Sequence, residues 1–281
     1  MMCGISGILF NSIDTGINKK NLQLMTQCLR HRGPDNISYY INNQLGLGHN
    51  RLSILDLSPN GNQPMVSFSG RYVISYNGEI YNHLQLRKKV RELYKFNKWS
   101  GSSDTSTLIN LFELWDINTL LQNLKGMFAL AVWDNKLHKL YLARDRFGEK
   151  PIYYSFINSQ FYFSSELKSF NKIINFDKKI SKKAINIYSR TNYIPSPYSI
   201  YENVYKLEPG SYLEILPGFN KIDEIKKDQN INSKYLKKVK WWNPQKKDLY
   251  YQNYRKLNYT DKIKKLDHIL EDLLNHKCYQ M

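Results

Sequence analysis

Strand-length apolar segments, joined in pairs by short turns, constrain the fold of this chain more than any other feature. The clearest pairs are residues 127–133 with 140–144 and residues 152–157 with 161–164. Asp134-Asn135 and Asn158-Ser159 occupy the turns, and such turn residues between apolar segments predict β-hairpins. Because a hairpin joins two neighbouring strands in opposite directions, we expect mainly antiparallel sheets with helices on their outer faces.

The remaining patterns complete an α+β prediction. Further strands are predicted at residues 4–10, 37–41, 45–50 and 71–76. Helices are predicted at residues 19–29, 83–94, 104–114 and 117–124. In the first of these helices Leu22, Met25 and Leu29 recur at spacings of three and four, which is typical of a helix with one buried face.

Composition excludes several classes of protein. The three cysteines are too few for a disulfide framework and show no metal-ligand spacing, so we expect a reducing, cytoplasmic location and no metal site. The chain has no leader pattern at its start and no apolar run of membrane-spanning length, which predicts neither secretion nor a membrane partner.

The formal net charge of +17 raises the possibility of nucleic-acid binding. The lysines, however, occur throughout the chain among Asn, Ile and Tyr, without an RNA-recognition signature, zinc-finger spacing or helix-turn-helix pattern. We therefore favour a compositional bias at surface positions over a nucleic-acid partner.

The character of the chain changes after about residue 214. Residues 218–232 are polar and charged and predict a linker, and residues 235–242 predict a short strand ended by a turn. Thr260 is predicted to cap a final helix. This helix carries an apolar stripe of Ile263, Leu266, Leu270, Leu273 and Leu274. A stripe of this kind needs a surface to pack on, so we expect it to be partly exposed or to depend on a partner.

The start of the chain, Met1-Met2-Cys3, places a cysteine where trimming makes it the terminal residue. A terminal cysteine carries both a thiol and a free α-amine, whose unperturbed pKa is about 7.7–8.0. That amine can serve the thiol as a general base, directly or through one water. The alternative interpretation of Cys3 is a small buried hydrophobic residue.

Three further segments contain residue types that suit a polar substrate, and each also has a purely structural explanation. Asn77-Gly78 is a common hairpin turn, and Arg51 suits the solvated end of a strand. Asp104 suits the cap of the helix that begins there. Taken singly, none of the three segments indicates a function.

Taken together, the motifs resemble one family. In chain order they read Cys-Gly-Ile, His-Arg-Gly-Pro-Asp, Arg-Leu-Ser-Ile, Tyr-Asn-Gly-Glu-Ile-Tyr-Asn, Ser-Asp-Thr, Gly-Met-Phe-Ala, Arg-Asp-Arg-Phe-Gly-Glu-Lys-Pro and Ser-Ser-Glu-Leu-Lys. This order resembles the class II glutamine amidotransferase domain of glutamine-hydrolysing asparagine synthetases, over residues 3–216. The resemblance implies an N-terminal-nucleophile hydrolase fold, which is a four-layer αββα sandwich. It also implies that residues 217–281 form a linker and a stub of an α/β synthetase domain.

The resemblance implies a role for three residues in the chemistry of glutamine hydrolysis. Cys3 is the expected nucleophile, and its α-amine is the expected proton shuttle. The Asn77 side chain and the Gly78 backbone N–H are the expected oxyanion hole, where glycine permits close approach and the unusual φ of a turn.

The resemblance also implies a binding site for glutamine as substrate. Arg51 is expected to hold the substrate α-carboxylate through a bidentate fork. Glu79 and Asp104 are expected to hold the α-ammonium group, and Leu52 and Ile54 are assigned to the same site.

Two departures from the family pattern are present. Family members usually begin Met-Cys, whereas here Met1 precedes Met2, a bulky second residue that blocks the usual aminopeptidase; initiation at Met2 would resolve this. No Ser-Gly-Gly-x-Asp-Ser-type pyrophosphate loop occurs in the sequence. We therefore expect a chain truncated before its ATP site, able to carry the glutaminase half-reaction and unable to make asparagine alone. ATP and magnesium are expected only for the missing synthetase domain, and no cofactor is expected here.

Alternatives remain open at this point. One is an inert or regulatory fragment, favoured if Cys3 stays blocked. Another is an amidotransferase subunit for a different acceptor, with the synthetase domain on a separate chain. A homodimer is also compatible with the sequence, which does not identify the final ammonia acceptor.

Overall fold

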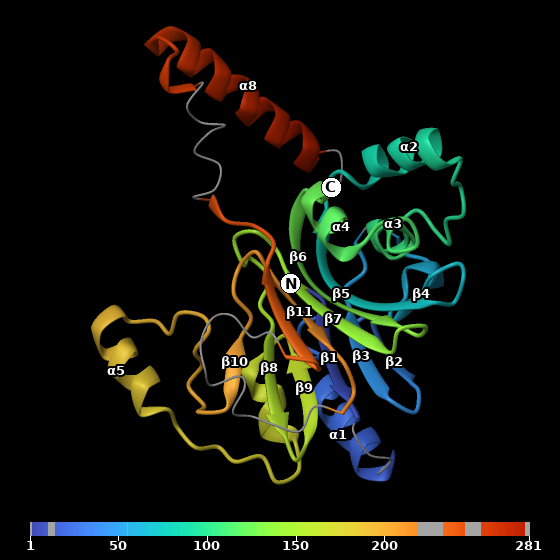
Figure 1. The fold of residues 1–281 in the computed structure, drawn as a ribbon, viewed down its shortest axis with the longest axis vertical. Helices are drawn as coiled ribbons and strands as arrows, with labels where there is room; N and C mark the ends of the chain where they lie inside the picture. Colours follow the sequence, from blue (N-terminus) through green and yellow to red (C-terminus); the bar gives the residue numbers. More distant parts are fainter. Residues whose placement is uncertain (1, 11–14, 55, 219–232, 245–253, 279–281) are drawn as a thin grey trace.

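The architecture is a sandwich of two sheets between helical layers, seen in a computed structural model that describes residues 2–10, 15–54, 56–218, 233–244 and 254–278. Two six-stranded sheets lie face to face, and every strand pairing in them is antiparallel. Helices cover the outer face of each sheet (Figure 1). The predicted α+β sandwich is therefore confirmed.

The first sheet has the strand order β10-β8-β9-β1-β3-β2. Its strands are β1 (Gly4–Leu9), β2 (Asn36–Ile41), β3 (Leu45–Arg51), β8 (Tyr153–Ile157), β9 (Gln160–Ser164) and β10 (Val204–Lys206). Helix α1 (Thr15–Gln27) and the 3-10 helix η2 (Leu167–Lys172) pack on its outer face. Leu22, Met25 and Leu29 are fully buried, as their spacing predicts, but the helix begins at Thr15 and ends at Gln27, so Leu29 lies in the turn beyond it.

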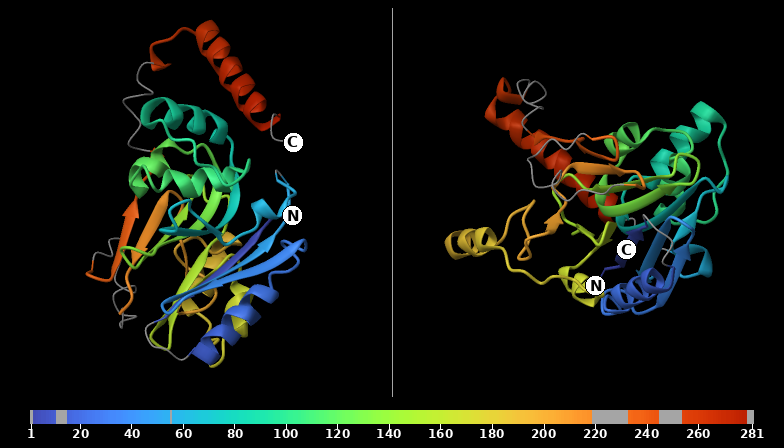
Figure 2. Two further views of the ribbon diagram at one scale, coloured as in Figure 1. Left: turned by 90° about the vertical axis from the view of Figure 1, so that its right-hand side faces the viewer. Right: turned by 60° about the horizontal axis from the view of Figure 1, so that its bottom comes forward.

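The second sheet has the strand order β12-β11-β7-β6-β5-β4. Its strands are β4 (Met65–Val66), β5 (Tyr72–Ile80), β6 (Gly126–Asp134), β7 (Lys139–Arg144), β11 (Ser211–Ile215) and β12 (Leu236–Lys240). Its outer face carries α2 (His83–Tyr94), α3 (Asp104–Leu111) and α4 (Ile117–Asn123), and two further views show this helical layer from the side (Figure 2).

Along β6 alternate side chains enter two different cores. Ala129, Ala131 and Trp133 pack between the two sheets, whereas the apolar residues between them pack against the outer helices. Because both faces of the sheet are covered, the strand is a continuous apolar run rather than an alternation of apolar and polar residues.

Both predicted hairpins are confirmed. The β8–β9 connection turns at Asn158 and Ser159, whose φ angles of 50° and 61° are the left-handed values that a tight type I′ turn requires. The β6–β7 connection is organised by Asp134, whose side chain accepts hydrogen bonds from the backbone N–H groups of Lys136 and Leu137. Local turn chemistry therefore positions these four strands.

Strand β5 corrects one sequence interpretation. It continues through Asn77 and Gly78 to Ile80, with Asn77 opposite Ala129 and Gly78 opposite Phe128 in the ladder with β6. The interpretation of Asn77-Gly78 as a turn is therefore wrong. A neighbouring strand is available along the whole segment, so pairing outweighs the local preference for a turn.

Several elements have no counterpart in the sequence prediction. Besides β4, β10 and β11, these are η2, the 3-10 helix η1 (Pro59–Gly61) and α5 (Lys182–Thr191). Of the residues of α5, only Ala184 is buried. The strands and 3-10 helices among them have six residues or fewer and carry too few apolar repeats to be seen in a sequence.

The predicted strand near residue 240 belongs to the second sheet. It is β12, which pairs with β11 along its whole length. Beyond it, Trp241 is 5% exposed, and its indole N–H donates to the Arg144 carbonyl at 3.3 Å. The predicted linker lies outside the described residues apart from Gly218, and the division of the chain at residue 216 stays a prediction.

The final helix, α8 (Tyr259–Cys278), begins earlier than its predicted cap. The Asn258 side-chain oxygen accepts a hydrogen bond from the Asp261 backbone N–H at 2.9 Å. Asn258 is therefore the cap, and the prediction of Thr260 is wrong.

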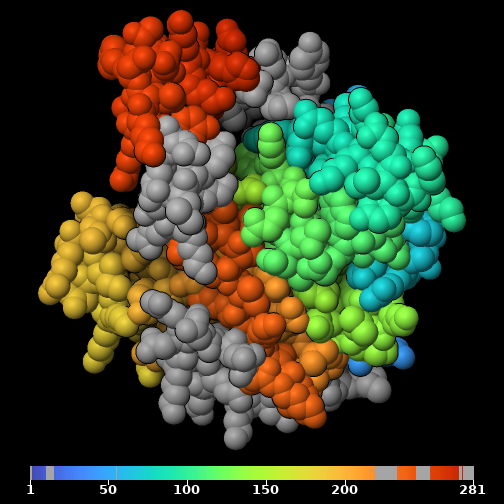
Figure 3. Space-filling model, turned by 45° about the horizontal axis from the view of Figure 1, so that its top comes forward, coloured from blue at the N-terminus to red at the C-terminus, as the bar shows by residue number. Residues whose placement is uncertain are grey.

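The apolar stripe of α8 is exposed, as the sequence predicts. The exposed fractions are 49% for Ile263, 56% for Leu266, 48% for Leu270 and 62% for Leu274. The side chain of Leu273 lies outside the described residues. In the space-filling view α8 forms a separate lobe at one edge of the molecule (Figure 3). None of the described helices is long and apolar enough to cross a membrane.

Candidate active site

A cavity of about 140 Å³ opens where the start of β1, the ends of β3 and β5, and the beginning of α3 meet. Every residue that the family resemblance assigns to the site lines this cavity: Cys3, Arg51, Leu52, Ile54, Asn77, Gly78, Glu79 and Asp104. These residues come from four separate parts of the chain, so the fold alone brings them together.

The Cys3 thiol lies against the peptide backbone of Leu52. The Leu52 N–H points to the sulfur at 3.4 Å, and the Leu52 carbonyl oxygen lies 3.7 Å from it. Burial raises the pKa of the Cys3 thiol, and the nearby Asp104 carboxylate acts in the same direction. The thiol is therefore protonated near neutral pH, and attack by its sulfur requires a base.

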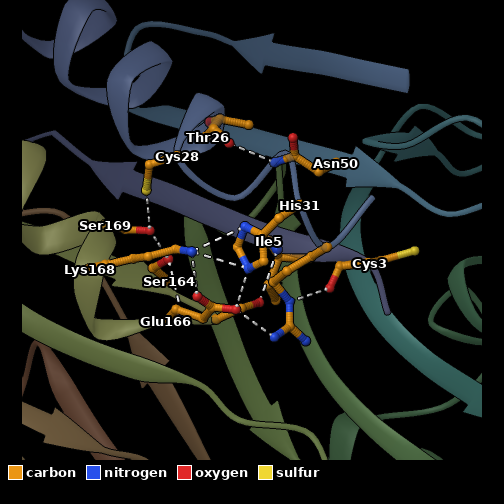
Figure 4. Close-up of polar contacts among 12 residues, drawn as sticks. Cys3, Ile5, Thr26, Cys28, His31, Asn50, Ser164, Glu166, Lys168 and Ser169 are labelled. Carbon is orange, nitrogen blue, oxygen red and sulfur yellow. Dashed lines mark hydrogen bonds and ion pairs between the residues drawn. The ribbon is translucent and has the colours of Figure 1, made fainter. Parts of the chain in front are cut away.

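The backbone of Cys3 is anchored by a charged cluster. Arg32 Nε donates to the Cys3 carbonyl oxygen at 3.0 Å, and Arg32 Nη1 contacts the Glu166 carboxylate at 2.8 Å. His31 and Lys168 also contact Glu166, at 3.0 Å and 3.2 Å. In Figure 4 the Cys3 sulfur points away from this cluster. Burial disfavours the charge of Glu166, but the three partners outweigh it and lower the pKa of Glu166 to about 2.

Asn77 offers a donor without an acceptor. Its side chain is 1% exposed, and its Nδ2 has no hydrogen-bond partner within the described residues. A buried polar group without a hydrogen-bond partner destabilises the fold by about 1–3 kcal/mol. A ligand oxygen in the cavity that accepts a hydrogen bond from Asn77 Nδ2 explains why such a group is present here.

Position 78 requires a glycine because strand β6 passes very close to it. A Cβ at this position would lie 2.2 Å from the carbonyl oxygen of Met127 on the neighbouring strand. Its φ is not among the positive values found in the structure, so the expectation of an unusual φ is wrong. The absence of a side chain lets β5 and β6 approach each other beside the cavity.

Arg51 is a buried cation without a salt bridge in the described part of the chain. It is 7% exposed and donates from Nη1 to the Ser58 carbonyl at 2.9 Å and to Asn62 Oδ1 at 2.8 Å. Its Nη2 donates to the Asp56 carbonyl. All these acceptors are neutral and fix the guanidinium group. A positive charge held beside a cavity in this way favours an anionic ligand group.

Asp104 is a buried carboxylate with three donors around it. Its Oδ2 accepts from the Tyr76 hydroxyl at 2.8 Å and the Ile80 N–H at 2.9 Å, and its Oδ1 accepts from the Thr105 N–H at 2.8 Å. Burial raises the pKa of Asp104, and the hydrogen bonds oppose that rise. The cap of α3 is Ser103, so the interpretation of Asp104 as a cap is wrong.

The cavity also contains residues that the sequence analysis does not assign: Met2, Asp56, Gly61, Gln63, Tyr76, Ser103, Thr105, Met127 and Lys150. Tyr76 and Lys150 lie inside motifs that carry the family resemblance, so their place in those motifs is a usable signal. Gln63 lies in a segment without any such signal. Within the described residues, no group of His, Cys, Asp and Glu side chains gathers as a metal site.

Comparison with known proteins identifies the family. A family model for a glutamine amidotransferase domain matches residues 2–226. The chain belongs to this glutamine amidotransferase domain family. The matched range begins at Met2 and continues past the end of β11, so it includes every residue assigned to the site.

Among curated relatives, asparagine synthetase [glutamine-hydrolyzing] 1 of Bacillus subtilis is 39% identical over 77% of this chain and 34% of the relative. Putative asparagine synthetase [glutamine-hydrolyzing] 2 of Methanocaldococcus jannaschii is 37% identical over 74% of this chain and 42% of the relative. The chain thus spans less than half the length of these relatives. These matches confirm the resemblance to the amidotransferase domain of asparagine synthetases.

A solved structure shows the same fold in a more distant protein. Glutamine phosphoribosylpyrophosphate amidotransferase from B. subtilis matches with a TM-score of 0.55 and 17% sequence identity. The match covers 85% of this chain and 49% of that chain. At this identity the likeness supports the two-sheet fold and no finer statement.

Proposed function

We propose that this chain hydrolyses glutamine to glutamate and ammonia, as the glutaminase half of an asparagine synthetase. The observation that carries the proposal is the shared cavity of the Cys3 thiol and the unpaired Asn77 amide. One supplies a nucleophile and the other a donor for a developing oxyanion, which are the two groups that amide hydrolysis needs most.

The chemistry follows from the placement of these groups. The Cys3 α-amine takes the thiol proton as the sulfur attacks the carboxamide carbon of glutamine. The carbonyl oxygen becomes an oxyanion that Asn77 Nδ2 and the Gly78 N–H stabilise. The protonated amine then donates to the leaving nitrogen, ammonia departs, and a thioester remains on Cys3. Water attacks the thioester, the carbon–sulfur bond breaks, and glutamate and the free thiol are released.

The two charged ends of glutamine fit opposite charges of the cavity. The fixed guanidinium group of Arg51 suits the α-carboxylate of the substrate. Glu79 and Asp104 suit its α-ammonium group. A substrate held at both ends presents its carboxamide to Cys3 in one orientation, which lowers the entropic part of the barrier.

We do not assign the ATP-dependent synthetase step to the residues of this chain. The curated relatives extend well beyond the part that this chain matches. We propose that ATP, magnesium and the ammonia acceptor are bound by a synthetase domain, on the same or a separate polypeptide.

The start of the chain decides whether the proposed base exists. While Met2 is attached, the nitrogen of Cys3 is an amide and cannot accept the thiol proton. Met2 also lines the cavity, with its sulfur 2.7 Å from Lys150 Nζ. Removal of Met1 and Met2 therefore both creates the base and enlarges the cavity.

A chain produced to begin at Cys3 is expected to release ammonia from glutamine, and a chain that retains Met2 is expected to be inactive. The comparison is made by intact mass spectrometry and a coupled ammonia assay on the same preparations. Equal activity of a preparation shown to retain Met2 would contradict the proposed base.

Arg51→Ala is expected to raise the KM for glutamine by about ten- to a hundredfold, because charged hydrogen bonds to the α-carboxylate are lost. The value of kcat is expected to change little. Arg51→Lys, which keeps the charge but not the fork, is expected to recover part of the loss. Steady-state kinetics check this, with Arg91→Ala on the exposed side of α2 as the control. An unchanged KM in Arg51→Ala would exclude the assigned role.

A further inference from the structure

We infer that Tyr76 is a positioning residue for the amino group of the substrate, and that its hydroxyl aims the Asp104 carboxylate at that group. This inference rests on the proposed function and deepens it. The sequence does not predict the contact between Tyr76 and Asp104, because Tyr76 lies in β5 and Asp104 lies at the start of α3, in separate parts of the chain.

The contact between the two side chains is buried and specific. Tyr76 is 2% exposed, Asp104 is 5% exposed, and both line the cavity that contains Cys3. The Tyr76 Oη lies 2.8 Å from Asp104 Oδ2. An ionised carboxylate only accepts hydrogen bonds, so the hydroxyl is the donor.

The backbone of Tyr76 is fixed on both sides, so its hydroxyl has little freedom. Its N–H donates to Gln63 Oε1 at 2.7 Å, and its carbonyl oxygen lies 3.1 Å from His49 Nε2. Burial lowers the pKa of His49 to about 4, so His49 is neutral and Nε2 is the donor. Gln63 Nε2 in turn donates to the Thr105 hydroxyl at 3.3 Å, which ties β5 to the start of α3.

This arrangement couples the two halves of the site through one residue. Asn77, the proposed oxyanion donor, follows Tyr76 directly on β5. The strand segment that carries the oxyanion donor therefore also holds the carboxylate that binds the amino group. Glutamine bound through its amino group is placed at a fixed distance from the groups that act on its carboxamide.

The charge of Asp104 depends on its donors. Burial and the neighbouring Glu79 raise the pKa of Asp104, whereas the Ile80 N–H, the Tyr76 hydroxyl and the Thr105 N–H oppose them. Among the described residues, the titratable or charged groups that interact with this carboxylate or share its cavity are Tyr76, Glu79, Cys3, Arg87, Arg51, Asp56 and Lys150. Loss of the Tyr76 hydroxyl removes one of the opposing donors, so the pKa of Asp104 rises and its charged form is lost at a higher pH.

The test uses two substrates that differ only in the group at issue, glutamine and 4-carbamoylbutanoate, which lacks the α-amino group. In a chain that begins at Cys3, Tyr76→Phe is expected to lower kcat/KM for glutamine about tenfold, through KM. The acid limb of its kcat/KM profile is expected to move to higher pH. Hydrolysis of 4-carbamoylbutanoate is expected to stay unchanged, because no amino group contacts Asp104.

Tyr72→Phe is the matched control, since Tyr72 lies on the same strand, is 6% exposed and is outside this cavity. It is expected to leave both substrates unaffected. In an Asp104→Asn background, Tyr76→Phe is expected to cost no further activity on glutamine. Equal losses on both substrates, or no loss on either, would overturn the role of Tyr76.

Glutamine binding measured by calorimetry in a Cys3→Ala chain distinguishes failure of the inference about Tyr76 from failure of the proposed function. Glutamine binding that weakens about tenfold on adding Tyr76→Phe supports the positioning role independently of hydrolysis. Glutamine binding that is unaffected by Tyr76→Phe overturns the inference alone. Absence of glutamine binding in Cys3→Ala overturns the proposed function and the inference together.

Discussion

Cys3→Ala is expected to abolish ammonia release in a chain that begins at residue 3, with a loss in kcat on the order of 10⁵-fold or more. The side chain of Cys3 is the proposed nucleophile in the cavity, and its removal leaves no atom to form the thioester. Glutamine binding is expected to persist, because the groups proposed to hold the substrate ends are unchanged. A coupled ammonia assay measures the loss, and calorimetry measures the binding.

Cys28→Ala provides the matched control for this experiment. The Cys28 sulfur contacts the Met25 carbonyl at 3.2 Å and the Ser169 hydroxyl at 3.3 Å, and Cys28 does not line the cavity. Its substitution is expected to leave hydrolysis unchanged. Retention of more than a trace of activity in Cys3→Ala would show that another group attacks the carboxamide.

Asn77→Ala is expected to lower kcat about 10²- to 10³-fold, with little change in KM. An oxyanion donor acts in the transition state, so its loss changes the rate of the chemical step more than the binding of the ground state. The unfolding temperature is expected to stay unchanged or to rise, because Asn77 Nδ2 is buried without a partner within the described residues. Steady-state kinetics and thermal unfolding of the same preparation check both parts.

Asn110 is the control because it is a buried asparagine whose side chain is fully engaged. Its Nδ2 donates to the Ser106 carbonyl at 2.8 Å, and its Oδ1 accepts from the Phe68 N–H at 3.0 Å. Asn110→Ala is expected to lower the unfolding temperature and to keep kcat. A reversed pattern, with Asn77→Ala less stable and equally active, would assign Asn77 a structural role.

Hairpins and the amphipathic helix were predictable because their signals are local. Asn158 and Ser159 adopt the backbone that a tight turn needs, and Leu22, Met25 and Leu29 bury one face of their segment. Strand β12 could be predicted as a strand, but its place beside β11 required the second sheet to be present. Short elements such as β4 and β10, with two and three residues, carry too little local signal and depend on pairing with neighbouring strands.

The sequence by itself determined the family, and with it the eight residues assigned to the site, all of which line the cavity, whereas other lining residues such as Gln63 were not assigned. Ordered motifs carry that information because each motif requires particular residue types at fixed spacing. Their geometry was decided by the tertiary structure: Asn77-Gly78 pairs with β6 instead of turning, and Asp104 meets the hydroxyl of Tyr76 instead of capping α3. The physical reason is that an isolated segment satisfies its polar groups locally, whereas a buried segment satisfies them with whatever donors and acceptors the neighbouring strands and helices provide.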